Sequence, residues 1–203
     1  MKKLYFILMI LAAIFLTACE FRLWPEKEEP EYSYEDTSYD LDDEYNEYTY
    51  DDTNSSYYEE FDPFVSLEGR FSINFPGEPT YSVSSVDTDY GTIDMHFFMY
   101  DESMYKAYMV AYADYPPQVV IDKGVELVLE DAANGMTSGM EVYYFEKTEQ
   151  NGYPGLAVSA SDDVDFMDVD IYLAGDRLYQ VAVVESYEYP LDGLDFLATF
   201  DIL

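Results

Sequence analysis

The chain has 203 residues, of which 49% are hydrophobic, and a formal net charge of -34. The hydrophobic content suffices for a packed domain, whereas the charge argues against nucleic acid as a partner, because a surface that binds phosphates needs Lys and Arg. A single Cys and a single His exclude a disulfide framework, a multi-cysteine metal site and the two-histidine zinc-protease motif.

The N-terminal segment is typical of an exported protein. Lys2 and Lys3 precede an uncharged apolar run over 4–18. This run is shorter than the roughly 18 residues of a membrane-spanning helix. A basic start followed by a short apolar core predicts a cleaved signal peptide over residues 1–18.

The signal peptide ends in Leu16-Thr17-Ala18-Cys19, which resembles the lipobox of bacterial lipoproteins. The resemblance implies that the Cys19 thiol receives a diacylglyceryl group and that Cys19 becomes the new N-terminus. The protein would then contact the membrane through its lipid anchor alone. Glu20 follows the Cys, and the absence of Asp at this position favours the outer membrane if the host is Gram-negative. The alternative is an ordinary signal peptide followed by an incidental Cys.

Residues 19–62 are predicted to form a disordered tether behind the lipidated Cys19. From residue 20 to 62 there are 17 acidic residues and eight Tyr against Arg22 and Lys27. High net charge with few aliphatic residues cannot offset the entropy of the chain. The tether is expected to act as a spacer; the alternative is a polyanion that binds cationic partners or divalent cations weakly.

Residues 63–203 are predicted to form one folded domain. Apolar side chains alternate with other residues, as in strands, over 71–75, 92–100, 105–114, 142–144, 156–158 and 168–173. Leu178–Val184 is apolar on both faces and is expected at the centre of the sheet. Apolar spacing of three and four predicts a helix from Ile121 to Ala132 and a shorter one over 191–198. The predicted fold class is α+β: an antiparallel sheet of seven or eight strands with two helices packed on it.

Five blocks of this domain together resemble uncharacterised exported bacterial proteins with a PsbP-like α/β/α sandwich. The blocks are Phe71–Pro79, Ala107–Pro116, Gly152–Gly155, Ile171–Gln180 and Phe196–Phe200. The resemblance implies a non-enzymatic binding or assembly module and carries no catalytic residues. The chain departs from the family in its charge, because acids stand where a mixed or basic strand is expected.

Two groups of residues are candidates for binding. The acids of the segment 162–170 could hold Ca²⁺, although they lack the spacing of an EF-hand; the alternative is a solvated strand face. They are Asp162, Asp163, Asp165, Asp168 and Asp170. Four tyrosines could form an exposed surface for a protein partner, or their rings could be core with the hydroxyls at the rim. They are Tyr108, Tyr112, Tyr172 and Tyr179.

His96 is the only side chain that could serve as a catalytic base near neutral pH. A surface or edge-strand His is the simpler interpretation, so no catalytic residue and no cofactor is predicted. The expected function is that of a lipid-anchored envelope protein with a non-catalytic binding or scaffolding domain. The alternative is a lipoprotein that binds Ca²⁺ through the segment 162–170.

Overall fold

The computed structural model of the protein describes residues 62–186 and 194–203, which form ten strands and three helices. The strands are β1 (Phe64–Ser66), β2 (Phe71–Ile73), β3 (Thr80–Thr88), β4 (Gly91–Asp101), β5 (Lys106–Asp114), β6 (Glu141–Gln150), β7 (Tyr153–Ser161), β8 (Asp165–Ala174), β9 (Arg177–Ser186) and β10 (Asp201–Ile202). The helices are α2 (Pro117–Lys123), α3 (Val125–Met136) and α4 (Leu194–Leu197). Among the described residues, no helix is long and apolar enough to cross a bilayer.

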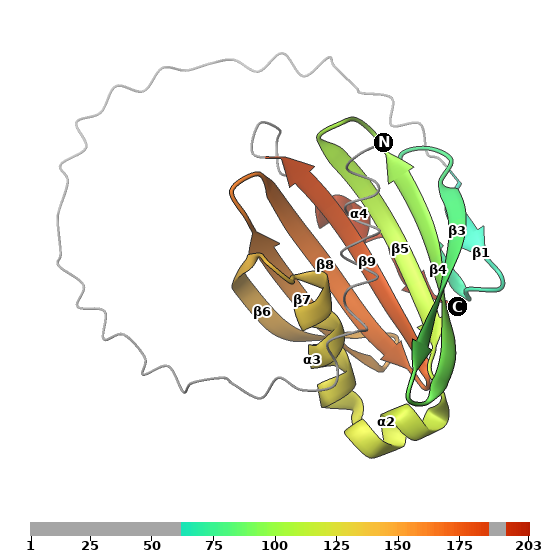
Figure 1. Ribbon diagram of the computed structural model, residues 1–203. Helices are drawn as coiled ribbons and strands as arrows, with labels where there is room; N and C mark the ends of the chain where they lie inside the picture. The colour runs from blue at the N-terminus through green and yellow to red at the C-terminus, as the bar shows by residue number, and fades with distance from the viewer. Residues whose placement is uncertain (1–61, 187–193) are drawn as a thin grey trace, which may run out of the picture. The chain divides into compact units, whose positions relative to one another are not determined.

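Seven strands form one antiparallel sheet in the order β3-β4-β5-β9-β8-β7-β6 (Figure 1). β9 is the middle strand, as predicted from the segment 178–184, which is apolar on both faces. A strand of this kind needs a cover on each side, so it cannot lie at an edge. The α+β class and the antiparallel sheet are thereby confirmed.

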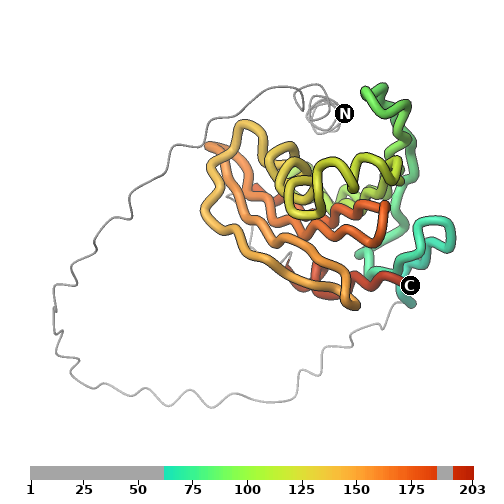
Figure 2. The backbone as a smooth tube through the Cα atoms, turned by 90° about the horizontal axis from the view of Figure 1, so that it is seen from below, coloured from blue at the N-terminus to red at the C-terminus, as the bar shows by residue number. Residues whose placement is uncertain are grey.

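The sheet separates two hydrophobic cores, and β5 shows how the sequence supplies both. Met109, Ala111 and Ala113 point to the first core, which is closed by α2 and α3. Tyr108 and Tyr112 point to the second core. Figure 2 shows α2 and α3 on one side of the sheet and the C-terminal strand on the other.

A second sheet of three short strands, in the order β1-β2-β10, contributes to the cover of the second core. The prediction of an antiparallel sheet of seven or eight strands holds for the large sheet, which has seven, but it did not include this second sheet. The short strands contribute Phe71 and Ile73, both fully buried, while α4 and the segment after it add Phe196 and Phe200. Of these short strands, β2 lies within the predicted alternation over 71–75, whereas β1 and β10, with three and two residues, are too short to show a period of two.

The single helix predicted over Ile121–Ala132 is in fact two helices, separated at Gly124. Gly124 has a φ of 82°, a value that glycine adopts without strain and that ends α2. Its carbonyl then accepts the N–H of Val128 at the start of α3. Most of the buried stripe belongs to α3, whereas α2 buries Val119 and leaves Ile121 exposed. Of the second predicted helix, α4 forms a single turn, and residues 187–193 lie outside the described residues.

The longest element that the sequence analysis missed is β3, one edge of the large sheet. It pairs with β4 from Thr80↔Met99 to Thr88↔Gly91. No side chain of β3 is buried, because an edge strand beyond both covering layers is solvated on each face. Its apolar residues, Tyr81, Val83 and Val86, are few and irregularly spaced, so the strand lacks the alternation that revealed the inner strands.

Phe71→Ala is expected to lower the free energy of unfolding by about 3–5 kcal/mol, the usual cost of removing a buried aromatic ring. The ring centroid of Phe71 lies 5.4 Å from that of Phe98 and 5.8 Å from that of Phe200, so the substitution opens the second core at its centre. Urea denaturation followed by circular dichroism measures the effect. Leu67→Ala, at a side chain that is 84% exposed, should change the value by less than about 0.5 kcal/mol. Equal losses for the two variants would contradict the assigned core.

Candidate functional site

The four tyrosines predicted as a partner surface are buried, so that prediction is wrong. Tyr108, Tyr112, Tyr172 and Tyr179 are only 5%, 2%, 5% and 1% exposed. They lie on neighbouring strands of the same sheet face and belong to the second core. The rings lie where the second layer packs, and the sequence pattern indicated the strand over 71–75 but not its place over these tyrosines. The alternative interpretation, tyrosine rings as core, describes them correctly.

The hydroxyl is the polar end of a buried tyrosine ring, and in Tyr108 and Tyr179 it donates a hydrogen bond within the domain. Tyr179 donates to the carbonyl of Gly69 at 2.8 Å, and Tyr108 donates to Glu102 at 2.9 Å. Burial raises the pKa of Tyr108 and that of Tyr112 to about 12. Both phenols therefore stay protonated at neutral pH. Such rings anchor the second layer on the sheet.

His96 lies in an aromatic stack on β4 and β5. Its Nδ1 atom is 2.7 Å from the hydroxyl of Tyr81, and its ring is parallel to that of Tyr112 with centroids 4.4 Å apart. The guanidinium of Arg177 also lies over Tyr112, 4.7 Å from the ring centroid. Packing and a hydrogen bond thus account for His96, which is half-buried on β4, the strand next to the edge strand β3.

An ion pair between β5 and β9 holds one end of the domain together. The buried guanidinium of Arg177 binds Asp114 through two hydrogen bonds, Nε to Oδ1 at 2.5 Å and Nη2 to Oδ2 at 2.6 Å. Its Nη1 atom donates to the carbonyl of Glu68 at 2.7 Å. Arg177 thereby ties the loop between β1 and β2 to the large sheet. The hydrogen bonds from Arg177 hold the pKa of Asp114 below its usual value.

The acids of the segment 162–170 have separate local partners. Asp162 accepts the N–H groups of Val164 and Asp165 at 2.8 and 2.9 Å, which closes the turn before β8. Asp168 accepts the hydroxyl of Ser159 at 2.5 Å, and Asp170 accepts that of Tyr172 at 3.1 Å. Asp163 is exposed beside the turn.

These five acids do not share one face. Asp162 and Asp163 lie at a turn, whereas Asp165 lies on one face of β8 and Asp168 and Asp170 lie on the other. Within 62–186 and 194–203, no three His, Cys, Asp or Glu side chains are placed to hold a metal ion together. Burial, reinforced by the nearby Asp168, raises the pKa of Asp170 above its usual value. Calcium binding by this segment stays a prediction that their geometry does not favour.

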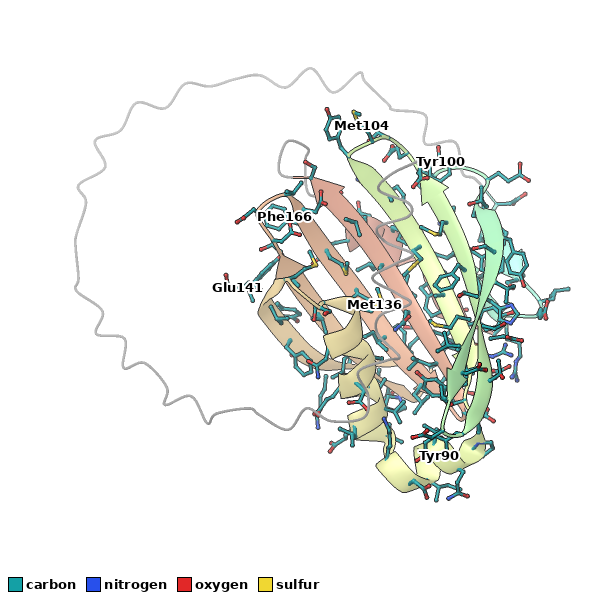
Figure 3. The ribbon with its side chains drawn as sticks, viewed as in Figure 1. Tyr90, Tyr100, Met104, Met136, Glu141 and Phe166 are labelled. Atoms are coloured by element: carbon teal, nitrogen blue, oxygen red, sulfur yellow. The ribbon has the colours of Figure 1, made fainter. Side chains whose placement is uncertain are left out.

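The largest exposed group of apolar side chains on one described strand belongs to β6, the edge opposite β3. Val142, Tyr143, Tyr144 and Phe145 are consecutive and are 44%, 57%, 45% and 49% exposed. They stand at the free edge, because β6 pairs only with β7 in the described part of the chain. Glu141, at the start of this strand, is labelled at the margin of the sheet in Figure 3.

The free edge of β6 is the candidate binding site, and the sequence carried one signal for it. Four consecutive large side chains place an aromatic ring on each face of the strand. A strand with one buried face would instead alternate apolar with polar residues. The structure explains the run by a bulge: the register with β7 shifts between Val142 and Tyr144. An exposed edge presents unpaired N–H and C=O groups on which another strand can pair.

No family model matches the chain, and no curated protein matches it. Among solved structures, the chain is similar to the solution structure of cyanobacterial PsbP (CyanoP) from Synechocystis sp. PCC 6803. The match covers 70% of this chain and 92% of that chain, with 10% sequence identity and a TM-score of 0.46. Cys19 and residues 20–61 lie outside the described residues.

Asp114→Asn is expected to destabilise the domain at pH 7 by about 1 kcal/mol, the upper value for a partly exposed ion pair. Because the pKa of Asp114 is lowered in the folded state, this stabilisation is present above the unfolded pKa of about 3.9 and is lost as the pH falls towards the folded pKa. Urea denaturation of both proteins at pH 7, 5 and 3 measures the difference. The difference between the two free energies of unfolding should be smaller at pH 3 than at pH 7; a gap at pH 3 as large as at pH 7 would rule out the ion pair as its source.

Proposed function

We propose that the protein is a lipid-anchored envelope protein whose folded domain binds another polypeptide along the free edge of β6. The single observation that supports this function is the exposed apolar run from Val142 to Phe145 on an edge strand. Apolar side chains beside unpaired backbone groups are the two features that strand addition uses.

The anchor follows from the sequence. The only Cys stands directly after a short apolar run that ends in Leu16-Thr17-Ala18. Two acyl chains hold a protein stably on a bilayer, because each buried CH₂ contributes about 0.8 kcal/mol. A tether of like charges, repelled by an anionic membrane surface, would hold the domain away from the bilayer and leave its edge accessible.

Binding is favoured over catalysis by how the reactive side chains are used. His96 is engaged by Tyr81 and Tyr112, and Arg177 is engaged by Asp114 and Glu68. The buried phenols have raised pKa values, so they are poor bases at neutral pH. These side chains are engaged in packing and hydrogen bonds within the domain. The edge of β6, by contrast, presents backbone groups and apolar side chains to a partner.

Photo-crosslinking in intact cells tests the proposed function. A photoreactive phenylalanine analogue at position 145 of the full-length protein should give one discrete protein adduct, since this side chain stands at the free edge. The same analogue at position 81, on the opposite edge strand β3, should give none. A metabolically supplied fatty-acid probe should label the protein and fail to label Cys19→Ser.

Equal adducts from positions 145 and 81, or no adduct from either, would contradict binding at the edge of β6. Equal labelling of the wild-type protein and Cys19→Ser would contradict the lipid anchor. The two readouts are independent, so each half of the proposed function can fail alone.

A further inference from the structure

We propose that the partner of β6 is an extended basic segment that adds a strand to the sheet, with basic and apolar side chains in alternation. Its basic side chains would face Glu141 and Glu146, and its apolar side chains would face Val142 and Phe145. This inference rests on the proposed function and names the chemistry of the partner.

The free edge of β6 is long enough to define a strand. Glu141–Gln150 has 10 residues, which corresponds to about 33 Å of extended chain. All of its described pairing is with β7, from Glu141↔Ser161 to Gln150↔Tyr153. Its outer row of backbone groups therefore provides the main-chain hydrogen bonds on which strand addition depends.

The register of β6 with β7 assigns its side chains to the two faces of the sheet. Phe145 and Lys147 pair with Val158 and Leu156, which belong to the core under α3. Lys147 accordingly reaches Glu126 of α3, with 2.6 Å between Nζ and Oε1. Val142 shares this face, because its partner is Ala160.

The opposite face of β6 is acidic. Glu141 and Glu146 pair with Ser161 and Ala157, so both carboxylates stand on the side away from α3. The hydroxyl of Tyr144 donates to Glu146. Behind them, on β8, lie Asp168 and Asp170. Along Glu141–Glu146, an added strand thus meets carboxylates on one face and apolar side chains on the other.

Most basic side chains of the domain already form ion pairs with carboxylates other than Glu141 and Glu146. Residues 63–203 contain 26 acidic residues and five basic ones. Four of the five form ion pairs with acids, and these are Lys106, Lys123, Lys147 and Arg177. Within residues 62–186 and 194–203, neither Glu141 nor Glu146 forms an ion pair, so a cation from another chain would meet unneutralised carboxylates.

Charge also indicates which kind of chain can bind along the edge of β6. A second copy of this domain would bring another net charge of -21, and residues 20–62 carry -15. Both would be repelled by an acidic edge. Opposite charges on directly opposed residues stabilise a strand pair, whereas like charges destabilise it. The complementary partner is therefore a basic chain.

The face of β6 towards α3 selects apolar side chains in that partner. α3 packs over β7 and β8, and Val142 and Phe145 remain about half exposed at the margin. An apolar side chain on the added strand would stand directly beside one of them, and both would lose contact with water. Because successive side chains of a strand point to opposite faces, basic and apolar residues must alternate.

The probe is a ten-residue peptide with blocked ends that alternates Lys with Val, titrated into the full-length lipidated protein in non-ionic detergent. Two comparison peptides carry Gln in place of Lys, or N-methyl groups on alternate backbone nitrogens. The protein variant is E141Q/E146Q. Its matched control is D87N/D94N, which removes two exposed acids from the opposite edge strand β3 and its neighbour β4.

The Lys–Val peptide should bind, and the Gln–Val and N-methylated peptides should bind at least about tenfold more weakly. E141Q/E146Q should weaken binding of the Lys–Val peptide by roughly tenfold, as expected from the loss of two cross-strand charge pairs, while D87N/D94N should change it by less than about twofold. Equal losses for the two variants, or undiminished binding of the N-methylated peptide, would overturn the inference in favour of diffuse attraction to an acidic chain.

The outcomes separate this inference from the proposed function. If position 145 gives an adduct in cells but the Lys–Val and Gln–Val peptides bind equally, the edge binds a partner and the basic chemistry is wrong. If position 145 gives no adduct, the proposed function fails, whatever the peptides do.

Discussion

Burial of β9 on both faces is the constraint on which the rest of the structure depends. Tyr179, Val181 and Val183 point into one core, and Leu178 and Ala182 point into the other. Neither face of such a strand can be left to water, so the domain needs a cover on each side of the sheet. The helix pair supplies one cover, and the short strands with α4 supply the other.

The two covers are narrower than the seven-stranded sheet, and this mismatch determines what stays outside. The middle strands lose contact with water on both faces, whereas β3 and β6 keep both faces at least partly exposed. The same geometry that removes Tyr172 and Tyr179 from the surface therefore leaves Tyr143 and Phe145 on it. Coverage, rather than the aromatic character of a residue, decides which rings a partner can reach.

Charge follows the same division between inside and outside. Arg177 forms an ion pair with Asp114, and Lys106 forms one with Glu185. Each pair joins β5 to β9. A buried cation needs its partner carboxylate because a lone charge in the interior is costly. With its few basic residues committed in this way, the domain has little left to neutralise its margins, and the edge of β6 stays acidic.

The inner strands were predictable because both of their faces pack against a hydrophobic core, and this packing leaves a recognisable pattern in the sequence. β5 alternates between two cores, and the segment 178–184 is apolar throughout because both of its neighbouring layers are apolar. β3 escaped prediction because water lies on both of its sides, and α2 was merged with α3 because a single Gly124 separates two stretches with compatible apolar spacing. The burial of Tyr172 depends on Phe200, whose ring stacks on it at 5.9 Å, a contact between distant residues that no local pattern records.

Amide-resolved hydrogen–deuterium exchange of the full-length protein, with and without the alternating Lys–Val peptide, tests the edge assignment most directly. Before peptide is added, the amides of β9 should be the most protected, and the β6 amides that point away from β7 should exchange rapidly, because exchange follows local hydrogen bonding and opening. On saturation with peptide, these β6 amides should become protected while those of β3 do not change. Unchanged exchange in β6 at saturation, or equal protection of β3, would contradict the claim that the free edge of β6 is the binding surface.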